Sequence, residues 1–268
     1  MRPEIIEPHE GRGLFGSDPR SYDAARPGHP ERVYEVLVEE CGLGPGTTVV
    51  EIGPGTGQAT RRLLELGAGP LIAIEPDPSL AAFLAEAFGR RIDVRIVALE
   101  DAELPAASVD LAVAASSFHW VEEEAALAKV FGALRPGGSW AMWWTLFGVP
   151  GKPDAFITAT TPLLEGLHAS PTSGEEGRLP HALDTEARFA ALEAAGFREL
   201  EHEVVPWSAS WDTSGIRALY ATFSPIARLE DDRRNEILDE VARIAEREFA
   251  GHVERTLLTS LYTARRPA

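Results

Sequence analysis

The feature that most constrains the fold is an apolar run that ends in an acid and opens into glycine at every second position, Val49-Val50-Glu51-Ile52-Gly53-Pro54-Gly55-Thr56-Gly57. Glycine adopts positive φ without strain and carries no Cβ, so a ligand can lie directly against such a backbone. Residues 58–66 are expected to form a helix, whose first free N–H groups face the same space as the loop. The pattern therefore predicts a strand, a ligand-binding turn and a helix, with a plain structural turn as the alternative.

The glycine spacing departs from the dinucleotide-binding fingerprint. The pattern G-x-G-x-x-G requires glycine at position 58 if it starts at Gly53, or at position 60 if it starts at Gly55. The chain has Gln58 and Thr60 at those positions. The spacing therefore argues against a nicotinamide-dependent oxidoreductase, which stays as an alternative function.

Alternating strand and helix patterns predict an α/β fold with a parallel sheet. Strands are expected at 48–52, 71–75, 94–98, 109–115, 139–145, 199–205 and 255–263. Helices are expected at 79–88, 122–134, 184–195 and 229–249. Ser79 is the expected N-cap of the first of these helices. The strand at 109–115 is almost wholly apolar, as a central strand covered on both faces should be.

The glycine loop resembles the first motif of the class I S-adenosylmethionine-dependent methyltransferases, E/D-x-G-x-G-x-G at the end of the first strand. The matching residues are Glu51, Gly53, Gly55 and Gly57, with Gln58 opening the helix. The resemblance implies S-adenosyl-L-methionine as cofactor and a Rossmann-like, seven-stranded, mostly parallel sheet with helices on both faces and a last antiparallel strand. It also implies a single domain, 1–268. The expected sheet core is about 40–145, 185–205 and 253–265, and the expected helical cap over the acceptor is about 1–39, 146–184 and 206–252.

An acid closes the second strand, 18 positions after Gly57. There Glu75 can accept hydrogen bonds from both ribose hydroxyls of a nucleoside, and Pro76 offers a flat apolar surface to the purine. Proteins that bind nicotinamide dinucleotides place an acid similarly, so Glu75 does not separate the two cofactors. After the third strand, the turn 99–105 resembles the adenine-binding turn of the family. Either Glu100 or Asp101 is expected to accept from the adenine amino group, and a solvated acidic turn is the alternative.

Two further segments carry the resemblance to a small-molecule branch that includes the trans-aconitate methyltransferases. One is Tyr22-Asp23-Ala24-Ala25-Arg26-Pro27, and the other is Phe118-His119-Trp120 after the fourth strand. The resemblance implies that Tyr22 and Arg26 cover the cofactor and neutralise its carboxylate. It also places Ser116 and His119 beneath the methionine part of the cofactor. An ordinary N-terminal helix docked on the core is the alternative for the first segment.

His119 has two candidate roles. A neutral imidazole beside the sulfonium can remove a proton from an acceptor hydroxyl or amine. The same ring, held between Phe118 and Trp120, can instead order the cofactor, and this is the role that we expect. Further candidates to line the acceptor pocket are His168, His181, Trp207, Trp211, Tyr220 and Phe223.

Composition limits the partners. The net charge is −17, with 42 acidic residues against 25 basic ones, which disfavours a nucleic-acid substrate. No stretch approaches the ~20 apolar residues that span a bilayer, so no membrane partner and a cytoplasmic location are expected. Cys41 is the only cysteine, and no metal is expected. We therefore expect methyl transfer to an oxygen, nitrogen or carbon of a small molecule. A non-catalytic cofactor-binding or interaction domain is the second alternative.

Overall fold

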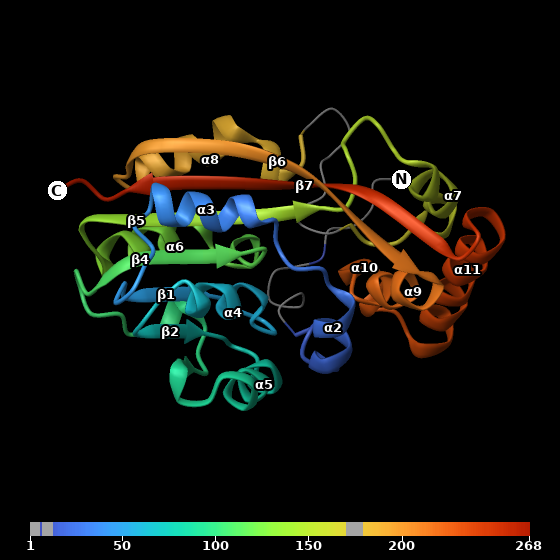
Figure 1. Cartoon of the computed structure of the whole chain (residues 1–268), viewed down its shortest axis with the longest axis horizontal. Coiled ribbons are helices and arrows are strands. Elements are labelled where there is room, and N and C mark those ends of the chain that lie inside the picture. The colour runs from blue at the N-terminus through green and yellow to red at the C-terminus, as the bar shows by residue number, and fades with distance from the viewer. Residues whose placement is uncertain (1–5, 7–12, 170–178) are drawn as a thin grey trace.

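The computed structural model describes residues 6, 13–169 and 179–268; residues 1–5, 7–12 and 170–178 lie outside the description. Its centre is a seven-stranded sheet with the order β3-β2-β1-β4-β5-β7-β6 (Figure 1). The strands are β1 (Val49–Ile52), β2 (Leu71–Ile74), β3 (Asp93–Arg95), β4 (Val109–Ala115), β5 (Leu134–Leu146), β6 (Arg198–Asp212) and β7 (His252–Arg265). The first five pair in parallel, and β7 lies antiparallel between β5 and β6. This order confirms the predicted fold class.

Helices cover both faces of the sheet because neighbouring residues of each strand point to opposite sides. Val50 packs with α6 (Glu123–Ala133) and α8 (Thr185–Ala194) in one apolar core. Val49 packs with α3 (Glu31–Glu39) and α4 (Gln58–Glu65) in a second core, which α5 (Pro78–Phe88) completes. The range of α3 was expected in the cap. Its Val33 and Leu37 are fully buried against the sheet instead, because they form an apolar stripe one helical turn apart.

A third apolar core holds the cap together at one end of the sheet (Figure 1). Its helices are α7 (Ala155–Leu164), α9 (Thr213–Ala221), α10 (Ser224–Ala227) and α11 (Asp231–Phe249). The short α2 (Pro19–Ala25) lies between these helices and the sheet. The described residues also form four 3-10 turns: η1 (Gly89–Arg91), η2 (Leu99–Asp101), η3 (Phe118–Trp120) and η4 (His181–Leu183).

Several element ends differ from the sequence expectations. The N-cap of α5 is Asp77 and not Ser79, because the Asp77 carboxylate accepts the N–H groups of Ser79 and Leu80 and Pro78 occupies the first helical position. Leu134, expected in a helix, begins β5. Strands β6 and β7 are longer than expected. Residues 252–257 of β7 no longer pair with β5 and pair only with β6, as a two-stranded ribbon that reaches the cap.

No helix in the described part of the chain combines the length and the apolar character that crossing a bilayer requires.

Candidate functional site

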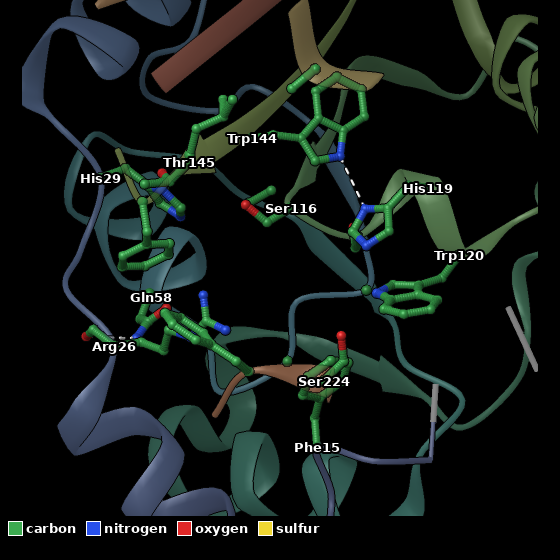
Figure 2. Close-up of a pocket in the computed structure, with 18 of the residues that line it drawn as sticks. Phe15, Arg26, His29, Gln58, Ser116, His119, Trp120, Trp144, Thr145 and Ser224 are labelled. Carbon is green, nitrogen blue, oxygen red and sulfur yellow. Dashed lines mark hydrogen bonds between the residues drawn. The ribbon is translucent and has the colours of Figure 1, made fainter. Parts of the chain in front are cut away.

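A cavity of about 650 Å³ lies where the carboxyl ends of β1, β2 and β4 meet the cap. Open parallel sheets bind ligands at this edge, where the strand order reverses. We call its two sides the sheet wall and the acceptor wall. The sheet wall is made of lining residues 52–56, 58, 59, 74–76, 80, 99 and 115–117, and the acceptor wall of lining residues 15, 22, 26, 27, 29, 119–121, 144–151, 153, 157, 180, 182 and 223–225. Figure 2 shows side chains from both walls around one open centre.

The three glycines of the loop have different structural roles. Gly55 lines the cavity with φ +60°, and a Cβ built on it would meet nothing within 4 Å. Gly57 is the N-cap of α4 with φ +82°, and its Cβ would lie 2.4 Å from the ring of Phe88. A Cβ on Gly53 would lie 2.6 Å from Cβ of Ser117. Gly55 therefore leaves space for a ligand, whereas Gly57 permits helix packing and does not line the cavity.

Glu51 is fully buried beneath the loop and lies outside the cavity lining. One carboxylate oxygen accepts the Thr60 hydroxyl at 2.6 Å, and the other has no hydrogen-bond partner in the described residues. Burial raises the pKa of Glu51 to about 7, against the opposing effect of the Thr60 hydrogen bond. Glu51 thus sits behind the sheet wall and not on it.

Glu75 and Pro76 both line the cavity at the end of β2. The Glu75 carboxylate is 4% exposed and accepts two backbone N–H groups, from Gly55 and Asp77, each at 3.0 Å. Burial raises the pKa of Glu75 to about 7, although both hydrogen bonds act in the opposite direction. An acid is therefore fixed against the glycine loop at the cavity surface.

Glu100 and Asp101 lie in η2, and both are exposed. Only Leu99 of that turn lines the cavity. The structure therefore brings the turn to the site while leaving both acids outside the lining.

Ser116 and His119 follow β4 and line the cavity (Figure 2). The indole Nε1 of Trp144 donates to Nδ1 of His119 at 3.0 Å. Because an indole N–H only donates, Nδ1 is the acceptor and the proton of the neutral ring resides on Nε2. Burial lowers the pKa of His119 to about 3. The ring therefore offers an N–H donor through Nε2, and its basic lone pair is already used by Trp144.

The segment around α2 joins the glycine loop to the cap. Arg26 donates from Nε to the Thr222 hydroxyl at 2.7 Å, and from Nη2 to the Thr222 carbonyl at 3.0 Å. Its guanidinium lies 5.0–5.3 Å from the ring centroids of Tyr22, Phe147 and Phe223. Gln58 donates to the Arg26 carbonyl at 3.1 Å. Tyr22, Arg26 and Gln58, three predicted site residues from two elements, thus meet at one side of the cavity.

Several lining residues were not singled out from the sequence. His29 lines the cavity 5.5 Å from the ring of Trp143, and its Nδ1 has no hydrogen-bond partner in the described residues. Burial lowers the pKa of His29 to about 4. Phe15, Trp144 and Phe147 also contribute to the acceptor wall. His29 follows the Arg-Pro-Gly stretch directly, and this adjacency was the available signal; the aromatic residues showed no periodicity that marks a pocket.

Of the residues suggested for the acceptor pocket, the structure places Phe223 in the lining. Tyr220 is buried in the cap core, and Trp207 donates to the Thr259 hydroxyl of β7. Trp211 packs against the cap core as well. His168 and His181 lie outside the lining.

Comparisons with known proteins agree with this arrangement. Residues 50–142 match a family described as a methyltransferase domain. An uncharacterized methyltransferase of Schizosaccharomyces pombe is 26% identical over 255 residues, which cover 93% of this chain and 96% of that protein. The trans-aconitate 2-methyltransferase of Mycobacterium tuberculosis is 33% identical over 137 residues, about half of each chain (50% and 49%).

Two solved structures share the fold. A protein from Anaeromyxobacter dehalogenans, provisionally named a type II methyltransferase, superposes with a TM-score of 0.64 at 21% identity, covering 90% of this chain and 98% of that one. The phosphoethanolamine N-methyltransferase 2 of Haemonchus contortus, solved with S-adenosylhomocysteine, superposes with a TM-score of 0.58 at 12% identity, covering 94% and 58%. The match to the methyltransferase domain and the methyltransferase relatives, together with the glycine loop, the acid at the end of β2 and the antiparallel β7, identify the chain as a class I S-adenosylmethionine-dependent methyltransferase.

Proposed function

We propose that this enzyme methylates a small molecule that binds between the sheet wall and the acceptor wall. The observation that carries the proposal is the continuity of the cavity, which runs from Gly55 and Glu75 to the aromatic residues of the cap. A cofactor on the sheet wall and an acceptor on the opposite wall would then share one enclosed space. This continuity favours an enzyme over a binding module whose cap is closed on the cofactor.

The residues of the sheet wall suit S-adenosylmethionine. Gly55 leaves open space where any other residue would place a Cβ, and the buried Thr56 hydroxyl has no hydrogen-bond partner in the described residues. We assign the ribose hydroxyls to Glu75 and the purine to the surface of Pro76 and Leu99, with Glu100 and Asp101 left as alternatives for the adenine amino group. Gly53 lines the cavity beside Gly55, whereas Glu51 and Gly57 support the loop from behind.

The methionine end of the cofactor is assigned to the junction of the two walls. Arg26, with Tyr22 beside it, supplies a positive charge for the carboxylate, and Gln58 holds this segment against the loop. Ser116 and His119 lie on the floor beneath. His119 acts here as a positioning residue, because its Nε2–H is a donor and its Nδ1 lone pair is engaged by Trp144.

When bound, the cofactor supplies an electrophilic sulfonium methyl group, which an acceptor atom takes by in-line displacement while the electrons of the broken C–S bond stay on sulfur. The protein contributes alignment of the two molecules and exclusion of water. The cap segments 13–30, 146–169, 179–184 and 206–252 contribute the acceptor wall or support it, and we propose that they form one domain with the sheet.

The test uses the purified protein with a methyl-labelled cofactor and a metabolite extract. Calorimetry should first show binding of S-adenosylhomocysteine and no comparable binding of NAD or NADP. Mass spectrometry should then find a labelled small molecule that is absent with the Gly55→Val variant. Equal or tighter dinucleotide binding would refute the cofactor assignment, and label found only on nucleic acid or protein would refute the small-molecule acceptor.

A further inference from the structure

The acceptor wall is almost free of charge. Of its described lining residues, Arg26 alone carries a full charge at neutral pH, and the wall has no aspartate, glutamate or lysine. Its two histidines, His29 and His119, are neutral at that pH because burial lowers their pKa values to about 4 and about 3. The wall thus differs from the chain as a whole, whose net charge is −17.

Apolar and aromatic side chains fill the same wall. Phe15 and Trp120 lie 6.0 Å apart between ring centroids, and Phe147 and Phe223 lie 5.3 Å apart. Figure 2 shows Phe15, Trp120 and Trp144 around the open centre of the cavity. Rings of this kind bind flat apolar molecules through their faces and edges.

The one cationic side chain of the described acceptor wall, Arg26, already has interaction partners within the protein. Two donors of Arg26 go to Thr222, and three aromatic rings surround its guanidinium. In the proposed function, on which this inference rests, Arg26 also neutralises the cofactor carboxylate. An acceptor that carries carboxylates would therefore bury charge without a partner, which is strongly unfavourable. What the wall offers to a polar group are uncharged side chains, such as His29, Thr145 and Ser224.

We propose that the acceptor wall selects an uncharged, ring-bearing, largely apolar molecule that carries a hydroxyl group. The same wall rejects polycarboxylates. The proposed acceptor therefore differs from the one named in the relative trans-aconitate 2-methyltransferase, although the two proteins are 33% identical over about half of each chain.

The test measures binding to the full-length protein saturated with S-adenosylhomocysteine. The probes are naphthalene-2-methanol, 2-naphthoate and propane-1,2,3-tricarboxylate; the first two share a ring system and differ in charge. The alcohol should bind at least about tenfold more tightly than 2-naphthoate, because the carboxylate would be desolvated without a counter-ion, and the tricarboxylate should bind most weakly. Binding of either acid as tightly as the alcohol, or no binding of the alcohol, would overturn the inference.

A variant shows whether the probes occupy this wall. Val149 lines the cavity on the cap side, away from the glycine loop. Val149→Arg adds a cation there and should narrow or reverse the preference for the alcohol, while Val149→Leu should keep it. An unchanged preference in Val149→Arg would place the probes elsewhere and overturn the inference. If the wild-type protein binds S-adenosylhomocysteine but prefers the acids, this inference alone fails; if it does not bind that nucleoside, the proposed function fails as well.

Discussion

The sheet wall and the acceptor wall enclose the same cavity but are built in opposite ways. The sheet wall comes from the ends of adjacent parallel strands, and its critical contacts involve backbone groups, such as the Gly55 N–H that Glu75 accepts. The acceptor wall is assembled from segments as distant as Phe15 and Phe223, and most of its lining residues contribute side chains. The residues that we assign to the cofactor therefore follow a local sequence pattern, whereas those that we assign to the acceptor are brought together only by tertiary packing.

The strongest test of this contrast replaces one glycine of the sheet wall. Gly55→Val places a branched side chain in the space that we assign to the cofactor and should abolish S-adenosylhomocysteine binding in calorimetry. Gly42→Val is the matched control, because Gly42 also has a positive φ of +73° and an open Cβ position but lies outside the cavity. Normal nucleoside binding by a folded Gly55→Val protein would make the loop purely structural.

The acid of the sheet wall should give the next largest effect. Glu75→Ala removes a charged acceptor for two hydroxyls, and hydrogen bonds to charged groups are worth roughly 1.5–3 kcal/mol each, so affinity should fall at least about tenfold. Because burial raises the Glu75 pKa to about 7, wild-type affinity should also fall as the pH is lowered through neutrality and the carboxylate is protonated. Glu75→Gln should lose that pH dependence.

Exposed acids provide the control for Glu75. Glu100→Ala and Asp101→Ala leave the cavity lining unchanged and should alter affinity less than Glu75→Ala. If Glu75→Ala binds the nucleoside normally while Glu100→Ala or Asp101→Ala loses affinity, the ribose site would lie elsewhere.

His119 sits where the two walls meet and should show an intermediate effect. With its Nδ1 lone pair engaged by Trp144, His119→Ala should mainly weaken cofactor binding and lower kcat by less than about tenfold at saturating cofactor. Once an acceptor is known, steady-state kinetics can separate the two parameters. A kcat loss of about 10² or more with intact cofactor affinity would instead establish His119 as the base.

The smallest effect concerns the acid behind the sheet wall. Burial raises the pKa of Glu51 from 4.5 to about 7, so between these values the folded protein binds more protons than the unfolded chain. Stability from this group is therefore present at low pH and is lost as the pH rises through 7. Relative to Glu51→Gln, the wild-type Tm should rise when the pH is lowered from about 7.5 to about 5, by roughly 2–4 °C for each kcal/mol of stability that is recovered. A parallel pH response in both proteins would contradict the assignment.

The sequence allowed the strands and the glycine loop of the sheet wall to be predicted, although Glu51, Gly57, Glu100 and Asp101 lie outside the lining. The apolar run before Gly53, the alternate glycines and the acid at position 75 are local signals, and β1, β2 and β4 lie where these signals indicated. The match to the methyltransferase domain shows the same difference between the two walls. The matched residues 50–142 include the sheet wall and end before Trp144 of the acceptor wall.

Much of the acceptor wall could not be predicted, for a physical reason. Phe147, Val149 and Phe15 lie in irregular segments without periodicity, so nothing in the sequence shows which neighbours they meet. The extension of β6 escaped prediction because its outer half alternates between exposed and half-buried positions and carries few fully apolar residues. The tautomer of His119 was equally hidden, since it is fixed by Trp144, 25 positions away.

Strand β7 has a consequence for how the molecule comes apart. Along its 14 residues it places Val253 in the cap core, Leu261 in the core under α3 and Tyr262 in the core under α6. One continuous strand thus contributes residues to all three apolar cores. If any one core unfolds, the other two lose part of the strand on which they pack. We therefore expect sheet and cap to lose structure in one cooperative step, without a partially melted form in which the cap is released from a folded sheet.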